Sequence, residues 1–170
     1  MLPQKVESYL LAALEGAPQL CKSLLSALSE TEADFRPDPD RFTIREALCH
    51  IADWELIFTE RLRTTVAEEN PILQGIDEGE VARAGNYGAR NCEQQLEKFA
   101  GRRAAMLEFI RSLEAGDWDR VAEHTEVGPI TVTQQVILVA AHDAYHIQQF
   151  AEWRRLFAIE AAKLGETLEE

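Results

Sequence analysis

The sequence predicts an all-α protein folded as a four-helix bundle. Apolar residues recur at spacings of three and four along four segments, whereas the alternation typical of strands is nearly absent. A chain of 170 residues, 46% of them hydrophobic, can bury a sizeable core in one domain. We therefore expect a single helical domain over residues 1–170. The four segments lie at about residues 6–28, 43–66, 91–115 and 131–165.

The helix boundaries are marked by local signals. Thr43 is followed three residues later by Glu46, and Thr131 by Gln134, and both pairs fit the capping-box pattern of a helix start. Pro18 falls inside the first segment, where it removes a backbone N–H and predicts a kink or a break. Residues 67–90 contain one proline and four glycines, and a connection of this length is either a crossover or a lid.

The charge of the chain argues against two classes of partner. Seventeen Lys and Arg residues against thirty Asp and Glu residues give a net charge of −13. Nucleic acids and anionic membranes both attract basic surfaces, and this chain has no basic stripe. The longest apolar run has six residues, against the ~20 that a membrane-spanning helix needs. We expect neither a nucleic-acid partner nor a membrane association.

The cysteines favour a reducing compartment. Cys21, Cys49 and Cys92 are odd in number and form no Cys-x-x-Cys motif, so neither a disulfide framework nor a thiolate zinc site is indicated. The apolar patch near the N-terminus is short and flanked by acidic residues, unlike a signal peptide. We expect free thiols and a cytoplasmic location.

Three histidines are candidate metal ligands. His142 and His146 are spaced i, i+4, which places them about 40° apart around one helix and about 6 Å apart along it. His50 lies on a mostly apolar face of the second helical segment. Three inward imidazoles from two helices would satisfy one another through a shared cation. Ordinary hydrogen bonds of buried histidines would explain the same pattern, and the spacing alone leaves both interpretations open.

Two other kinds of metal site fit the sequence poorly. A di-iron bundle needs Glu-x-x-His, but Ala47, Val139 and Asp143 stand three residues before the histidines. A zinc protease needs His-Glu-x-x-His, and here Asp143 takes the place of the glutamate, with a shorter side chain. A metal-dependent hydrolase therefore stays a minor alternative.

The segments FTIREALCHIADWE and VAAHDAYHIQQF, about ninety residues apart, resemble those of the DinB-like (DinB/YfiT) superfamily of bacterial metal-binding bundles. The resemblance covers most of the chain, and the pairing of both segments carries it. It implies an up-down-down-up bundle in which residues 67–90 form the crossover. It also implies one divalent metal held by His50, His142 and His146, and a homodimer.

The resemblance also suggests a reaction. Relatives include bacillithiol-dependent thiol S-transferases and a mycothiol-dependent maleylpyruvate isomerase, which implies a low-molecular-weight thiol cofactor and a small-molecule substrate. Three imidazoles leave a coordination position open, and a divalent ion there would bring a bound water to a pKa of about 7 and deprotonate a thiol more readily. The leading prediction is thus a metal-dependent thiol S-transferase. The alternative is a non-catalytic, stress-associated dimeric metal-binding bundle.

The ion and the supporting residues are less well defined. Three histidines suit several transition metals, of which we expect zinc or nickel. Asp53 is a candidate acceptor for a ligand imidazole, or else it faces solvent or pairs with Arg45 or Arg61. Gln149 is a candidate contact of a metal-bound species. Arg61 either binds the carboxylate of the thiol or forms a surface ion pair. We expect His124 to be solvated in a loop and Tyr145 to pack in the core.

Overall fold

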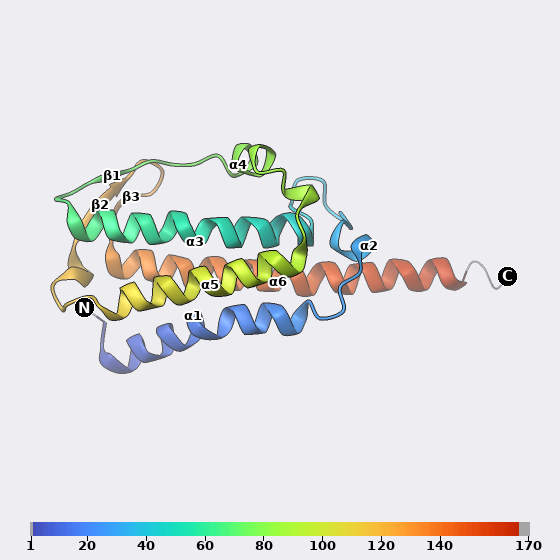
Figure 1. Cartoon of the computed structure of the whole chain (residues 1–170), viewed down its shortest axis with the longest axis horizontal. Coiled ribbons are helices and arrows are strands. Elements are labelled where there is room, and N and C mark those ends of the chain that lie inside the picture. Colours follow the sequence, from blue (N-terminus) through green and yellow to red (C-terminus); the bar gives the residue numbers. More distant parts are fainter. Residues whose placement is uncertain (1, 167–170) are drawn as a thin grey trace.

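Four long helices form the molecule, as Figure 1 shows. The computed structural model describes residues 2–166, so residues 1 and 167–170 of the predicted domain lie outside it. The predicted all-α four-helix architecture is confirmed. The long helices are α1 (Gln4–Leu24), α3 (Ile44–Ala67), α5 (Cys92–Arg111) and α6 (Val132–Glu166). The shorter elements are the helices α2 (Glu30–Ala33) and α4 (Glu78–Ala84), the 3-10 helices η1 (Tyr87–Ala89) and η2 (Asp117–Asp119), and the strands β1 (Ile72–Leu73), β2 (Val121–His124) and β3 (Gly128–Thr131).

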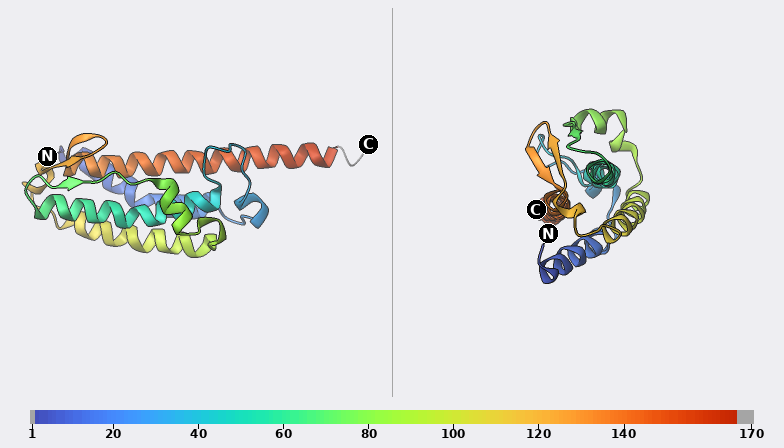
Figure 2. Two further views of the ribbon diagram at one scale, coloured as in Figure 1. Left: turned by 90° about the horizontal axis from the view of Figure 1, so that it is seen from above. Right: turned by 90° about the vertical axis from the view of Figure 1, so that its left-hand side faces the viewer.

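The helices follow an up-down-down-up course. In Figure 1, α1 and α6 run from left to right, whereas α3 and α5 both run from right to left. Each helix packs against two neighbours, in the cyclic order α1, α5, α3, α6, and the end-on view in Figure 2 shows this ring. Two neighbouring pairs are therefore parallel. The crossover between α3 and α5 returns along the whole bundle and carries β1, α4 and η1.

Both predicted capping boxes are present. The Thr43 hydroxyl accepts from the Glu46 amide (3.2 Å), and the Glu46 carboxylate accepts from the Thr43 amide (2.9 Å). Thr131 and Gln134 exchange the same two hydrogen bonds at 3.1 and 2.9 Å. These bonds satisfy backbone N–H groups that a helix start leaves without partners, so local sequence determines where α3 and α6 begin.

Of the kink or break predicted at Pro18, the break does not occur, because α1 stays helical from Gln4 to Leu24. Proline lacks the N–H that would bond the carbonyl four residues earlier, which here belongs to Leu14. That carbonyl instead accepts from Nη1 of Arg103 on α5 at 2.9 Å. A side chain from another helix thus replaces the missing backbone bond, and the helix continues.

A small sheet was not predicted. β2 pairs in parallel with β1 and antiparallel with β3, in a three-stranded sheet beside the start of α6. Its inner side chains are Leu73, Ala122 and Ile130, all buried. Strands of two to four residues are too short to show a hydrophobic alternation, which is why the sequence pattern did not reveal them.

Arg103 lies at the centre of the bundle with 1% of its surface exposed. Its guanidinium donates to both carboxylate oxygens of Glu55 on α3 (2.5 and 2.8 Å) and of Asp143 on α6 (2.6 and 2.9 Å). The Leu14 carbonyl on α1 accepts its remaining bond. One side chain therefore connects all four long helices, between two clusters of buried apolar residues.

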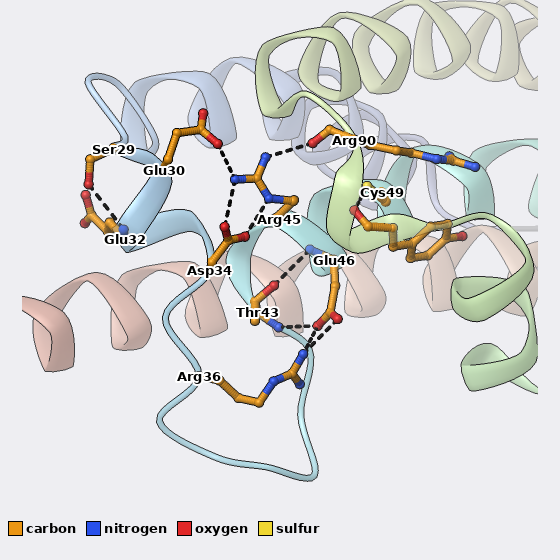
Figure 3. A network of polar contacts seen from close by, with 11 residues as sticks. Ser29, Glu30, Glu32, Asp34, Arg36, Thr43, Arg45, Glu46, Cys49 and Arg90 are labelled. Atoms are coloured by element: carbon orange, nitrogen blue, oxygen red, sulfur yellow. Dashed lines mark hydrogen bonds and ion pairs between the residues drawn. The ribbon is translucent and has the colours of Figure 1, made fainter.

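A second arginine, Arg45, holds two segments that lie near the start of α3, as Figure 3 shows. Arg45 is buried and donates to Asp34 (2.6 Å) and Glu30 (2.5 Å) in the segment before α3. It also donates to the Arg90 carbonyl at the end of the crossover (2.9 Å). The Arg45 side chain thereby attaches both segments to the first turn of α3.

Helix α6 is the longest element, with 35 residues, and its C-terminal part extends beyond the other helices (Figure 2). Phe157 in this part packs edge-on against Phe35 at a centroid distance of 5.4 Å. Even α6 is not apolar enough to cross a membrane, and the same holds for every other helix within residues 2–166.

We expect Arg103→Met to destabilise the protein by about 3–5 kcal/mol, because Glu55 and Asp143 would remain buried without a counter-charge. Urea unfolding followed by circular dichroism measures this change. Arg111→Met is the matched control, since Arg111 forms an exposed ion pair with Glu15 (3.3 Å) that should contribute less than about 1 kcal/mol. Equal losses in the two variants would contradict the role assigned to Arg103.

Candidate metal centre

The structure brings together the three histidines singled out from the sequence. One ring nitrogen each from His50 on α3 and from His142 and His146 on α6 lie within 4.8 Å of one another. The Nε2 atoms of His50 and His142 are 2.9 Å apart, and the ring centroids are separated by 4.6–5.0 Å. The convergence is a structural fact, and the assignment of the three residues as metal ligands stays a prediction.

Apolar and aromatic groups surround these imidazoles. His50 and His146 are 1% and 4% exposed, and His142 is half-buried. The Trp54 ring lies 4.1 Å from that of His50, one helical turn further along α3, and the Phe58 ring lies 5.3 Å from that of His142. These walls exclude water, so a charge placed among the three rings would interact strongly with its neighbours.

Burial keeps all three histidines neutral at pH 7. Burial, together with repulsion between the histidines, lowers the pKa of His50 to about 3 and that of His142 to about 2. Burial also lowers the pKa of His146 to about 4, although the hydrogen bond to Gln149 opposes this shift. Neutral imidazoles carry the lone pairs that a metal ion needs, without competition from protons.

The orientation of His146 follows from hydrogen-bond donors and acceptors. Nε2 of Gln149 donates to the Phe42 carbonyl (2.7 Å), which leaves its Oε1 to face Nδ1 of His146 (3.0 Å). An amide oxygen can only accept, so Nδ1 of His146 carries the proton and Nε2 keeps its lone pair. Gln149 therefore orients the candidate ligand His146 through Nδ1, the ring nitrogen that is not free to bind an ion. The sequence analysis placed Gln149 on the helix face of His142 and His146 and predicted a contact with a metal-bound species instead of this hydrogen bond to His146.

The chemistry of the donor set fits a divalent ion. The Nε2 atoms of His50 and His142 are in contact, so without a cation one of them must donate to the other. Nδ1 of His50 is buried and has no hydrogen-bond partner among the described residues. Buried polar atoms without a partner are uncommon, and a bound ion or water is one explanation for them. Three nitrogen donors from neutral imidazoles are the ligand type that zinc and nickel accept.

A cavity of about 480 Å³ lies beside two of these rings. It opens between α6, the segment before α3 and the start of α4, and no other His, Cys, Asp or Glu of the described chain joins the cluster. The cluster therefore combines three candidate protein ligands with an adjacent cavity. The cavity lining includes His142, His146, Tyr145, Gln149, Arg41, Phe42, Asp40, Glu78 and Gly79.

Asp53 and Arg61, offered as supporting residues, have other partners. The Asp53 carboxylate accepts from Arg90 and Arg102, both at 2.8 Å, rather than from an imidazole. Burial raises the pKa of Asp53, but hydrogen bonds from the two arginines outweigh it and hold the pKa below its usual value. Arg61 donates to the Gln74 carbonyl (2.7 Å) and does not line the histidine cavity.

Two predicted environments are wrong. His124 lies in β2, is 7% exposed and accepts from the Glu126 amide through Nδ1 (3.2 Å), so it is not solvated. Tyr145 is 50% exposed, and its ring packs edge-on against His146 instead of entering the core. Tyr145 is thus a wall of the cavity.

The sequence did not reveal the cavity residues Arg41 and Glu78. Both lie outside the long helices, one before α3 and one at the start of α4, where no periodic pattern relates them to the histidines. The only available signal was the length of residues 67–90, which predicted a crossover or a lid without naming its functional side chains.

Comparison with known proteins places the chain in a family. A family model described as the DinB superfamily matches residues 13–150, which include all three histidines. The chain belongs to the DinB superfamily. A candidate metal-dependent hydrolase of Oceanobacillus iheyensis is 26% identical to this DinB-superfamily chain over 134 residues, or 79% of this chain and 77% of that protein. A similarly named protein of Geobacillus kaustophilus is 23% identical over 146 residues, or 85% and 82%.

The fold of this DinB-superfamily protein also matches a solved structure. YfiT from Bacillus subtilis, described as a candidate metal-dependent hydrolase with an unusual four-helix bundle topology, superimposes with a TM-score of 0.87. The match covers 93% of this chain and 91% of YfiT at 18% sequence identity. The resemblance predicted from the two histidine segments is confirmed at the level of family and fold.

The metal-free protein should lose stability as the pH falls from about 7 towards 4. In this range the unfolded histidines, with pKa values near 6.5, bind protons that the folded ones do not. The free energy of unfolding therefore falls on acidification, by up to about 1.4 kcal/mol per pH unit for each histidine. Urea unfolding at several pH values measures this slope, and His142→Leu should remove about a third of the histidine contribution. Identical slopes in the two proteins would contradict the buried neutral state.

Proposed function

We propose that this protein is a divalent-metal-dependent enzyme whose ion is bound by His50, His142 and His146. The observation that supports it is the convergence of three neutral imidazoles beside a solvent-connected cavity, with no fourth protein ligand in the described chain. Structural zinc sites are closed by four protein ligands, whereas catalytic sites keep a position for water or substrate. The same observation makes a non-catalytic metal-binding bundle the weaker alternative.

The roles of the chain's own residues follow from their contacts. A divalent ion at this site would supply Lewis-acid chemistry and lower the pKa of a bound water or thiol. Gln149 holds His146 in the tautomer whose Nε2 is free to bind an ion. Trp54 and Phe58 exclude water from behind the rings, and α4 with the segment before α3 encloses the substrate.

The reaction we propose first is transfer involving a low-molecular-weight thiol. The cavity has the volume of a small-molecule site, and Arg41 and Glu78 give it charges of both signs, which suit a small thiol with a carboxylate and an amine. Hydrolysis is the second candidate, because the relatives from Oceanobacillus and Geobacillus carry that name. Both reactions use the same three histidines.

Metal content tests the proposal directly. Protein made without a histidine tag in zinc- and nickel-supplemented medium should contain about one equivalent of ion per chain by elemental analysis, since residues 2–166 form one such cluster. His142→Ala should lose the ion, whereas His124→Gln, which changes a histidine outside the cluster, should retain it. Metal-free wild-type protein, or equal loss in both variants, would overturn the proposal.

The same preparation separates the two reactions. Cobalt-loaded protein titrated with cysteine should develop a sulfur-to-metal charge-transfer absorption if the site accepts a thiol. Retention of cobalt without this absorption would favour hydrolysis, which a panel of ester and amide substrates would then test.

Gln149→Leu should weaken metal binding by about 10–100-fold, because His146 would lose the acceptor that orients its ring. Competition with a chromophoric chelator measures the affinity. Gln148→Leu is the matched control, since it makes the same change on an exposed neighbour. Equal affinity in the two variants would show that Gln149 does not position a ligand.

Several further features stay proposals. The homodimer and the small-molecule substrate rest on the family resemblance, and the cytoplasmic location rests on the free cysteines. That residues 1–170 form one domain is likewise proposed from length and helical pattern.

A further inference from the structure

A second cavity adjoins the histidine cavity. It also measures about 480 Å³ and lies between the segment before α3 and the helices α4 and η1. Asp40, Arg41, Phe42 and Gly79 line both cavities, so the two adjoin, and we refer to the pair as the depression. One end of this depression reaches His142 and His146, and the other reaches Arg83.

The arginines of the second cavity differ in their partners. Arg36 pairs with Glu46 (2.6 Å) and Arg41 with Glu152 (3.2 Å), although the buried Nε of Arg41 has no acceptor among the described residues. The Arg83 side chain makes no hydrogen bond or ion pair within the described chain. Its charge is therefore available to a ligand in this cavity.

Gly79 keeps the junction of the two cavities open. Glycine inside a helix costs about 1 kcal/mol relative to alanine, yet it occupies the second position of α4. A Cβ at this position would lie 3.2 Å from Nη1 of Arg83 and 3.2 Å from Oδ1 of Asp77. A larger side chain would thus enter the space next to the guanidinium of Arg83.

The two ends of the depression have different electrostatic preferences. Glu78 lines the histidine end, and partial desolvation together with repulsion from Glu126 and Asp77 raises its pKa. An anionic group is therefore disfavoured beside Glu78 and favoured beside Arg83. Asp40 and Asp77 near the Arg83 end favour a single negative charge over a doubly charged phosphate.

We propose that Arg83 binds a terminal carboxylate of an extended substrate whose reacting end lies at the three histidines. Arg83 is then a specificity-determining residue, and the substrate class is a monocarboxylate long enough to pass Gly79. This inference rests on the proposed function, because it places the reacting end at the metal site.

Ligands that carry a metal-binding head group, with or without a carboxylate at the other end, test the inference. Zinc-loaded protein is titrated calorimetrically with ω-mercaptocarboxylic acids of increasing chain length and with the corresponding mercaptoalcohols. A parallel series carries a hydroxamate instead of the thiol, so that the test does not depend on which reaction the enzyme performs. At one or more chain lengths the carboxylate should bind about tenfold more tightly than the alcohol, the size expected for one charge-assisted contact.

Arg83→Met should abolish this preference without changing the affinity for the alcohols or the zinc content. Arg155→Met, which removes an exposed arginine outside both cavities, should keep the preference. Gly79→Val should weaken the longer members of both series, because its side chain narrows the junction through which they pass. Unchanged binding of the shortest alcohols shows that each variant is folded and that its metal site is intact.

The outcomes separate the two proposals. A carboxylate preference that persists in Arg83→Met, or its absence at every chain length in the wild type, would overturn the role of Arg83 alone. Failure of both head groups to bind zinc-loaded protein would overturn the proposed function, and the inference with it.

Discussion

Arg103 carries a guanidinium with five N–H donors into the centre of the bundle, where the surrounding helices must supply every acceptor. Glu55, Asp143 and the Leu14 carbonyl do so, and the two carboxylates belong to the helices that also carry the candidate ligands. Burial raises the pKa of Glu55, and Arg103 opposes this shift. Because Asp143 follows His142 directly, the ion pairs that hold α3 to α6 also hold His50 opposite His142.

The candidate site is rigidly supported, although placing its polar imidazoles in the protein interior costs free energy. Three neutral imidazoles, two of them buried and one half-buried, are less stable in isolation than an apolar core would be, and Nδ1 of His50 adds to this because it has no partner among the described residues. Proteins accept such local costs where function requires them, and the surrounding ion pairs and aromatic contacts keep the rings in place. An incoming cation would therefore find its ligands already arranged, with little loss of side-chain freedom on binding.

Features encoded by local sequence were predicted well, and features that depend on distant contacts were not. The apolar spacing and the capping boxes at Thr43 and Thr131 predicted the four long helices. The i, i+4 spacing predicted that His142 and His146 lie on one face of a helix. The continuity of α1 through Pro18 depends on a side chain from α5, which no local pattern contains. The short strands and the arginine partners of Asp53 depend in the same way on residues far along the chain.

The parallel course of α3 and α5 determines what covers the histidines. Between antiparallel neighbours a few residues would complete the connection, but here the chain must travel back along the bundle before α5 begins. The returning segment forms a roof over the cluster, and none of the side chains of α4 is buried. Leu73 and Tyr87 anchor the two ends of this segment in the core, whereas the residues of α4 between them can change with less effect on folding. Related chains could in this way acquire new substrates while the helices and the imidazoles beneath stay the same.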